Sequence, residues 1–394
     1  MVSKLDTKLR MQLEAAKQAG VLRQRQQFDA VDDPLSSDLY HLGKRYHNFS
    51  GNDYLGLASS ECLQQAAVEG VKQYGVGSAA SPLVSGYSDA HQALERSLCD
   101  ATGHEAALLF CSGFSANSAL MQTLFDRNDY VVCDRLLHAS LIDGLLHSGA
   151  KFNRFKHNDI NHAQQLLSKQ QPSAIVTESV FSMDGDVAPI NALYQLAQEA
   201  QCWLIVDDAH GFGLQPSYPS PEALSAQSCD IQVVTFGKAL GCQGAAILAS
   251  QLVIDYLVAN ARHYIYSTAL SPLNAHIAFN AVQSVRQGDE RRTQLKRNIE
   301  FFKQCCSDYQ VATLAVSSPI QPIVIGDNDK VLTLAANLKH QGFLVGAIRP
   351  PTVPKGSARL RVTLSALHSQ SQIKDLVIAI AQGLKELSPL QQQD

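Results

Sequence analysis

A lysine that follows an apolar, β-branched stretch is the first residue of this sequence suited to covalent chemistry. Lys238 lies in Val233-Val234-Thr235-Phe236-Gly237-Lys238-Ala239-Leu240-Gly241. A desolvated lysine loses its proton readily and becomes a nucleophile that forms a Schiff base with an aldehyde. A surface lysine in a loop after a core strand is the simpler interpretation, and this segment alone favours neither.

An acid and a histidine follow another apolar run. Asp207 and His210 come directly after residues 203–206. A carboxylate at the end of a hydrophobic strand is costly unless it meets a cation or a proton donor. Asp207 facing a pyridine nitrogen would keep that nitrogen protonated, and His210 would donate to the phenolic oxygen of the same ring. A helix cap followed by a core histidine explains the stretch equally well by itself.

A third stretch offers a seat for an anion. Ser112-Gly113-Phe114 follows Ala106–Phe110 where a helix is predicted to begin, and free N–H groups at a helix start bind anions. Capping by Ser112 is the alternative. An anion seat, an acid and a lysine, in this order along one sheet, together predict a pyridoxal-phosphate (PLP) site.

Short apolar strands that alternate with helical segments predict the elements that position these groups. The strands are 106–110, 130–133, 174–178, 203–207, 232–235 and 245–248. Continuously apolar strands between helices are typical of a mainly parallel sheet with both faces covered. Because ligands bind at the carboxyl ends of such strands, we expect the three stretches to meet at one edge.

Both ends of the chain differ in texture from this α/β region. Residues 1–30 show leucines at helical spacing and predict an amphipathic helix that packs on the body or on a partner chain. From about residue 283 the pattern predicts helices over 288–306 and 371–387 with strands between them, an α+β layer. We therefore expect a helical arm (1–45), a PLP-binding α/β domain (46–285) and a small α+β domain (286–394).

Composition excludes several other classes of protein. A length of 394 residues favours two cores, and the formal charge of −4 argues against a nucleic-acid partner. The nine cysteines show no C-x-x-C spacing, so neither a disulfide framework nor a metal site is expected. No apolar run reaches membrane-spanning length and the N-terminus has no signal core, so a cytoplasmic protein without membrane contact is expected.

Longer motifs connect these groups to a known family. They are Ser50-Gly51-Asn52-Asp53-Tyr54-Leu55-Gly56-Leu57, Ser85-Gly86-Tyr87-Ser88, Cys111-Ser112-Gly113-Phe114, Asp134 with His138-Ala139-Ser140, Glu178-Ser179-Val180-Phe181-Ser182-Met183-Asp184-Gly185-Asp186, Asp207-Asp208-Ala209-His210 and Thr235-Phe236-Gly237-Lys238. From residue 22 to about 368 the chain resembles the α-oxoamine synthases, fold-type I PLP enzymes that join an amino acid to an acyl thioester with loss of CO2. The resemblance implies a seven-stranded, mainly parallel central sheet.

The resemblance also implies a role for each matching residue around the cofactor. Lys238 would hold PLP as a Schiff base and move the substrate Cα proton, Asp207 would pair with the ring nitrogen, and His138 would stack on the ring. The remaining cofactor-binding residues would be Ser112, Gly113, Phe114, Glu178, Ser182, His210 and Thr235, with Ser267 and Thr268 reaching the site of the neighbouring subunit in a homodimer.

Further positions match those that bind substrate in the family. Asn52 and Arg361 would hold the amino acid's carboxylate, a task that suits a guanidinium fork. An arginine that alternates with apolar residues in a strand more often faces solvent, and only the family position reverses that expectation for Arg361. Arg349, Thr352 and Arg23 would lie near the acyl chain or the mouth of the site.

Two segments indicate which member of the family the chain resembles. Ala347-Ile348-Arg349-Pro350-Pro351-Thr352-Val353-Pro354 matches the branch that joins L-alanine to a pimeloyl thioester in biotin biosynthesis. Leu83, where a polar residue would bind a succinyl carboxylate, favours a longer methylene chain. Whether coenzyme A or an acyl carrier protein carries the acyl group stays open, as does the loop shape at Ala79 and Ala80, where glycine is common in the family.

Other functions remain as alternatives. They are glycine C-acetyltransferase or 5-aminolevulinate synthase-like activity and, more remotely, a non-catalytic subunit of a synthase complex or a binding module without cofactor.

Overall fold

The large sheet is built from seven strands in the order β3-β9-β8-β7-β6-β4-β5. The computed structural model describes residues 3–18, 21–23, 25–29 and 36–387. The strands are β3 (Ala106–Phe110), β4 (Tyr130–Asp134), β5 (Lys151–Phe155), β6 (Ala174–Glu178), β7 (Trp203–Asp207), β8 (Ile231–Thr235) and β9 (Ala245–Ala249). β9 pairs antiparallel with β3 and β8, whereas the other pairs are parallel. The predicted α/β fold with a seven-stranded, mainly parallel sheet is confirmed.

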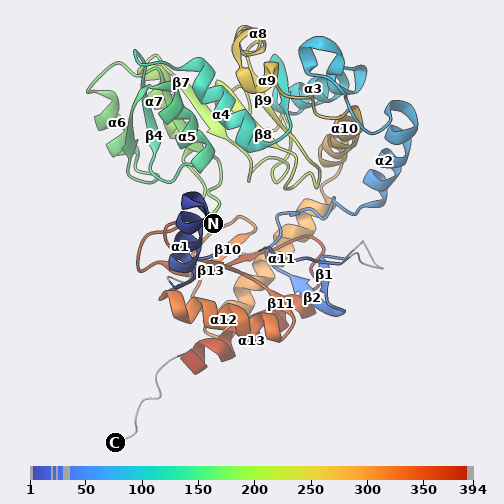
Figure 1. The fold of residues 1–394 in the computed structure, drawn as a ribbon, viewed down its shortest axis with the longest axis vertical. Coiled ribbons are helices and arrows are strands. Elements are labelled where there is room, and N and C mark those ends of the chain that lie inside the picture. The colour runs from blue at the N-terminus through green and yellow to red at the C-terminus, as the bar shows by residue number, and fades with distance from the viewer. Residues whose placement is uncertain (1–2, 19–20, 24, 30–35, 388–394) are drawn as a thin grey trace, which may run out of the picture.

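Helices cover both faces of this sheet (Figure 1). On one face, alternate side chains such as Leu108, Val131 and Ile205 pack against helices α4 (Gly113–Leu124), α5 (Ala139–Ser148) and α8 (Gln251–Asn260). On the other face, strand residues pack against α3 (Asp89–Thr102), α6 (Ile160–Leu167), α7 (Ile190–Glu199) and α10 (Pro272–Gln287). Burial on both faces explains why the strands read as continuous apolar runs.

The strand register brings the polar strand ends to one edge of the sheet. Glu178 lies opposite Asp207 in the β6–β7 pair. Ala245 of β9 pairs with Thr235 of β8 on one side and with Phe110 of β3 on the other. The turn after β3 and the loop that carries Lys238 therefore leave the sheet next to each other.

Two three-stranded sheets make up the part of the fold drawn below the large sheet in Figure 1. One sheet is β1 (Asp38–His41), β2 (Lys44–Asn48) and β11 (Phe343–Leu344); the other is β10 (Ile320–Gly326), β13 (Ala358–Thr363) and β12 (Gly346–Ile348). Helices α11 (Glu290–Asp308), α12 (Asn328–His340) and α13 (Gln370–Leu387) accompany them. The remaining helices are α1 (Lys4–Gln18), α2 (Glu61–Tyr74), the π-helical turn Pro82–Gly86 and α9 (Arg262–Ile265).

The N-terminal helix is shorter and less buried than its pattern indicates. α1 ends at Gln18, and none of its residues is buried within the chain. Its apolar side chains Leu5, Leu9 and Leu13 face solvent. β2 also pairs with β11 of the C-terminal part. We propose that the chain is divided into residues 1–45, 46–285 and 286–394, and that β1 and β2 pack on the last of these units.

Candidate active site

A cavity of about 170 Å³ lies at the carboxyl ends of β6, β7 and β8, and we call it the strand-end cavity. It brings together most of the residues that the sequence singles out for cofactor chemistry. Its lining consists of Gly113, Phe114, Asn117, His138, Glu178, Asp207, Ala209, His210, Val233, Val234, Thr235 and Lys238.

Lys238 lies in the loop between β8 and β9. Burial lowers the pKa of its amine from 10.5 to about 8, while the carboxylates of Asp207 and Glu178 act in the opposite direction. Gly241 ends the turn at a φ of +63°, and a Cβ there would lie 2.2 Å from the backbone nitrogen of Ala58. The loop is thus pressed against neighbouring backbone, which fixes where the lysine emerges.

Asp207 is buried at the end of β7 and is held by two donors. The side-chain amide of Asn117 donates to Oδ2 at 2.6 Å, and the backbone N–H of Ala209 donates to Oδ1 at 3.0 Å. Burial, reinforced by the charge of Asp207, raises the pKa of Glu178 well above its usual value. Glu178 and Asp207 thus lie side by side at the strand ends, and both act on the amine of Lys238.

His210 is held by a tyrosine that is distant in the sequence. Its Nδ1 shares a hydrogen bond of 2.6 Å with the hydroxyl of Tyr54. Burial, together with the positive charges of Lys238 and Arg361, lowers the pKa of His210 well below its usual value. The imidazole is therefore neutral and has a fixed orientation at the cavity wall.

The start of α4 forms another part of the wall. Ser112 caps the helix, since its hydroxyl accepts from the backbone N–H of Ser115 at 3.2 Å. Gly113 and Phe114 line the cavity, and N–H groups of a first turn have no acceptor within their own helix. The Thr235 hydroxyl lies across from them and donates to the carbonyl of Gly244 at 3.2 Å. Ser112 thus has its predicted capping role, and the start of α4 lies at the cavity.

His138 begins the next helix, α5, at the same edge of the sheet. Its Nδ1 lies 2.7 Å from the hydroxyl of Ser140, and its ring meets that of Phe114 edge-on. Burial lowers its pKa, with the charges of Asp207 and Lys238 acting in opposite directions. The ring is thus held by its cap position at the cavity wall.

Arg361 is buried on β13 and does not face solvent. Its Nε donates to the carbonyl of Ser182 at 2.6 Å, Nη1 to Thr363 Oγ1 at 3.0 Å and Nη2 to Asn52 Oδ1 at 3.2 Å. The expectation from strand alternation is wrong here because every residue of β13 is buried. Arg361 and Asn52 thus lie together, whereas the hydroxyl of Ser182 is not part of the lining of the strand-end cavity.

The other predicted site residues lie outside the strand-end cavity of this chain. Ser267 and Thr268 are exposed just after α9, Arg23 and Thr352 are exposed, and Arg349 is half-buried at the end of β12. One chain brings none of them to Lys238. Ala79 adopts a φ of +55°, the left-handed region that favours glycine, which settles the local loop shape.

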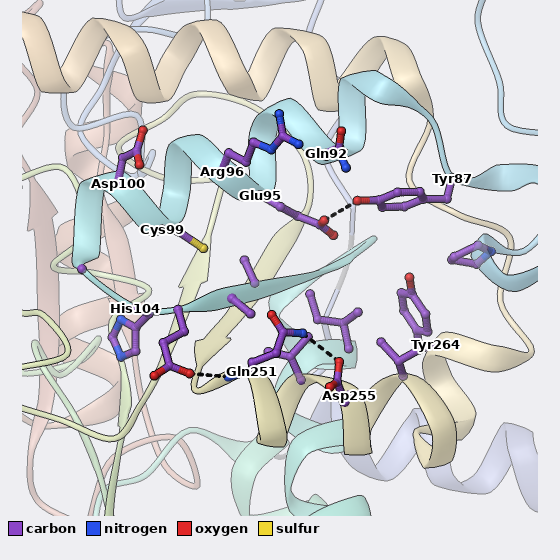
Figure 2. Close-up of a pocket in the computed structure, with 18 of the residues that line it drawn as sticks. Tyr87, Gln92, Glu95, Arg96, Cys99, Asp100, His104, Gln251, Asp255 and Tyr264 are labelled. Carbon is purple, nitrogen blue, oxygen red and sulfur yellow. Dashed lines mark hydrogen bonds between the residues drawn. The ribbon is translucent and has the colours of Figure 1, made fainter.

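A larger hollow of about 1070 Å³ lies elsewhere on the chain (Figure 2). Tyr87 and Glu95 meet on its wall, where the tyrosine hydroxyl donates to the carboxylate at 2.6 Å. Burial raises the pKa of Glu95 to about 7. Leu83 also lines this hollow and not the strand-end cavity, so the single chain gives its predicted contact with an acyl chain no support.

Two contacts of the cavity have only weak signals in the sequence. Asn117, one turn into α4, and Tyr54, in the polar turn before α2, hold Asp207 and His210 across separations of 90 and 156 residues. A buried helical asparagine and a tyrosine beside Asn52 are the signals available, and neither names its partner. Hydrogen bonds over such separations depend on the assembled fold.

None of the helices in the described ranges is long and apolar enough to cross a membrane. Over those same ranges, no group of three or more His, Cys, Asp or Glu residues is arranged to hold a metal ion.

Known proteins resemble this chain along most of its length. The family model for aminotransferase class I and II matches residues 44–380. The 8-amino-7-oxononanoate synthase of Vibrio parahaemolyticus is 46% identical over 353 residues, 89% of this chain and 92% of that protein.

Solved structures show the same fold. The 8-amino-7-oxononanoate synthase of Francisella tularensis has a TM-score of 0.75 at 31% identity and covers 86% of this chain and 98% of its own. A serine palmitoyltransferase from S. paucimobilis, solved with a bound PLP–myriocin aldimine, has a TM-score of 0.88 at 24% identity over 98% of both chains.

Proposed function

The chain belongs to the aminotransferase class I and II family, and on this premise we propose that it condenses L-alanine with a pimeloyl thioester. The products are 8-amino-7-oxononanoate, CO2 and a free thiol, and the reaction serves biotin biosynthesis. The observation that carries this proposal is the 46% sequence identity between this chain and three 8-amino-7-oxononanoate synthases, over 88–89% of the chain.

The residues of the strand-end cavity fit PLP as the cofactor. A buried lysine of lowered pKa suits its aldehyde, the buried carboxylate of Asp207 suits a protonated ring nitrogen, and the α4 start with Thr235 suits its phosphate. Among the described residues, the buried Oδ1 of Asn117 also has no hydrogen-bond partner. When bound, PLP supplies an aldehyde that takes up an amine and a ring that withdraws electrons from the adjacent carbon.

The protein's own groups then perform three tasks. Lys238 removes the Cα proton of alanine and later returns one, which its near-neutral pKa allows. Asp207 would keep the ring nitrogen of PLP protonated, and that positive charge would draw electron density away from Cα. His138 covers one side of the cavity. His210, which is neutral and fixed by Tyr54, would donate to the phenolic oxygen of PLP.

Arg361 and Asn52 orient the alanine. Three of the five guanidinium N–H groups bind Ser182, Thr363 and Asn52, so the fork has a fixed plane. The Tyr54 hydroxyl also interacts with the guanidinium, which still has further donors. A carboxylate that accepts those donors would place Cα near Lys238. For the acyl donor, we assign Arg349, Thr352 and Arg23 to the mouth of the site, with coenzyme A and a carrier protein as possible carriers.

We also propose that the active unit is a homodimer. Ser267 and Thr268 are exposed and remote from their own cavity, as expected of residues that serve the neighbouring subunit's phosphate seat.

Turnover with L-alanine and pimeloyl-CoA, compared with glycine and acetyl-CoA or succinyl-CoA, tests the assignment. We expect turnover with the first pair and at least about 100-fold lower kcat/KM with the others. Preference for glycine with either short thioester would identify one of the alternative activities. A purified protein without the absorbance of bound PLP would instead favour a non-catalytic subunit, although the joint presence of Lys238, Asp207 and His210 in one cavity argues against that.

A further inference from the structure

Residues 179–188 form a loop between the large sheet and the C-terminal sheet, and we call it the bridging loop. It leaves β6 and folds back on itself through a bridge between Val180 and Val187. The backbone N–H of Phe181 donates to Asp186 at 3.0 Å, and that of Gly185 donates to Phe181 at 2.8 Å. The loop is therefore a small ordered unit with its tip at residues 182–186.

On one side, the tip holds two arginines of β13. The carbonyl of Ser182 accepts from Nε of Arg361 at 2.6 Å, and Asp184 forms an ion pair with Arg359. Gly185 has a φ of +70°, and a Cβ there would lie 2.3 Å from the carbonyl oxygen of Ile320 in β10. The tip thus supplies the shortest of the three hydrogen bonds that place the Arg361 guanidinium.

On the other side, the tip is held by a histidine from the loop after β5. His157 Nε2 lies 2.6 Å from Asp186 Oδ2, and its Nδ1 lies 3.0 Å from Oδ1 of Asp134, which is fully buried at the end of β4. Asn158 joins the same two carboxylates, with its side chain 2.7 Å from Asp186 and its backbone N–H 2.9 Å from Asp134. The His157 ring also packs edge-on against Phe181 at 4.4 Å.

The charge state of His157 agrees with this bridging geometry. Burial alone would lower its pKa, but the hydrogen bonds and charges of Asp134 and Asp186 raise it to about 10. Both ring nitrogens therefore carry protons at neutral pH, and each donates to a carboxylate.

We propose that His157 is a positioning residue for the amino-acid substrate, because it fixes the bridging loop and the loop fixes Arg361. The proposal rests on the proposed function, in which Arg361 binds the carboxylate of alanine. His157 does not line the strand-end cavity. It contacts Asp186, whose carbonyl accepts from the Phe181 N–H, and the next residue, Ser182, binds Arg361. The bridging loop also connects the large sheet to the C-terminal sheet, because it follows β6 and binds Arg359 and Arg361 of β13.

Two substitutions separate the two contacts of the histidine. In His157→Asn the amide reaches only the place of Nδ1, which keeps the contact with Asp134 and loses the one with Asp186. In His157→Gln the amide reaches the place of Nε2 and keeps the contact with Asp186. His147→Asn is the matched control, because His147 is an exposed histidine of α5 whose Nδ1 bonds to a backbone carbonyl.

Amide hydrogen exchange of the holoenzyme tests the hold on the loop. We expect exchange in a peptide covering residues 179–188 to rise about ten-fold in His157→Asn, and to change less than about three-fold in His157→Gln and in the control. Unchanged exchange in His157→Asn, an equal rise in both variants, or a uniform rise along the whole chain would overturn the proposal.

Steady-state kinetics test the effect on the substrate. We expect the KM for L-alanine to rise about ten-fold in His157→Asn, with kcat and the KM for pimeloyl-CoA changed less than about two-fold. An unchanged KM for L-alanine contradicts the link to Arg361. If His157→Asn does not fold, Asp186→Asn carries both measurements, since Asp186 is partly exposed. Wild-type protein without turnover would refute the proposed function, and the exchange result would still decide whether His157 holds the loop.

Discussion

Lys238 combines burial with nearby acids, and this combination sets its reactivity. With a pKa of about 8, roughly a tenth of the amines are neutral at pH 7, which is roughly 300-fold more than for a lysine at 10.5. Asp207 limits the shift, since its charge favours the ammonium form. The residue is therefore both nucleophilic and able to carry a proton near neutral pH.

The lowered pKa predicts how the apoprotein takes up PLP as the pH changes. Only the neutral amine attacks an aldehyde, so the rate of capture should rise with pH through about 8 and level off above it. Stopped-flow absorbance between pH 6 and 10.5 measures this rate. In Asp207→Asn the midpoint should move to lower pH because a charge that favours the ammonium is lost. A wild-type midpoint near 10.5 would contradict the burial of Lys238.

The fork of Arg361 predicts a large effect of a formally conservative change. Arg361→Lys keeps the charge but loses the planar contacts with Ser182, Thr363 and Asn52. We expect the KM for L-alanine to rise at least about 30-fold, while the KM for pimeloyl-CoA changes little. Arg154→Lys, at an exposed position of β5, is the control and should behave like the wild type. Equal effects of the two variants would remove Arg361 from the substrate site.

Residue types alone indicated the cofactor-facing groups but not the residues that hold them. Lys238, Asp207 and His210 each follow an apolar strand, so their common edge could be predicted. The hydrogen bonds of Asn117 and Tyr54 depend on packing between distant segments and have no local pattern. Arg361 was ambiguous because alternation in a strand indicates one solvent-facing side, whereas β13 is buried throughout.

At the scale of elements, the site depends on a hairpin inside a mainly parallel sheet. β8 and β9 are antiparallel neighbours, so the loop that carries Lys238 is anchored at both ends within a few residues. The backbone of Gly241 touches Ala58, which ties this loop to the segment before α2.

Gly241 and Gly43 offer a matched pair of substitutions. Both have positive φ values, +63° and +74°, but a Cβ at Gly43 meets nothing within 4 Å. We expect Gly43→Ala to lower the free energy of unfolding by about 1 kcal/mol from backbone strain alone. Gly241→Ala adds a clash with Ala58 and should cost at least about 3 kcal/mol, with weaker binding of PLP. Urea denaturation measures both, and similar losses would show that the close approach is unimportant.

Strands that are buried on both faces were predictable, and a half-exposed strand was not. The central strands were recognised because burial on both faces makes them apolar throughout. β5 was missed because its sequence, Lys151-Phe152-Asn153-Arg154-Phe155, is half exposed and charged, whereas β3 at the other edge of the sheet is apolar and buried. α12 was missed as well, and α1 proved shorter than its leucine spacing indicated.

At the scale of the whole molecule, several exposed features of one chain fit the proposed homodimer. Ser267 and Thr268 lie in the open, and Val76, Leu83 and Val84 are exposed apolar residues from the segment between α2 and α3. The apolar side of α1 has no buried residue within the chain. An interface that covers these residues is consistent with the proposed homodimer.

Mixing a variant without the lysine and a variant with weakened PLP binding, assayed at limiting PLP, tests whether the subunits share their sites. Lys238→Ala should lower turnover by at least about 1000-fold, and Ser267→Ala combined with Thr268→Val should weaken PLP binding at least about ten-fold. A mixed dimer contains one site with an intact lysine and intact residues from the partner. Co-refolded variants should therefore regain about a quarter of wild-type turnover, the statistical share of such sites. Failure to regain activity would place Ser267 and Thr268 outside the partner's site.

The position of β9 between β3 and β8 has a consequence for synthesis of the chain. β3 ends at residue 110, but the strand that it pairs with begins at residue 245. At about 5–20 residues per second, the ribosome needs roughly 7–27 s to extend the chain by 135 residues, from residue 110 to residue 245 (245 − 110). During that interval the apolar β3 has no neighbour in its final sheet, and an unpaired strand edge is a template for aggregation. Nascent chains that stop before residue 249 should therefore bind chaperones strongly. In those chains the turn after β3, which we assign to the phosphate, should not be ordered.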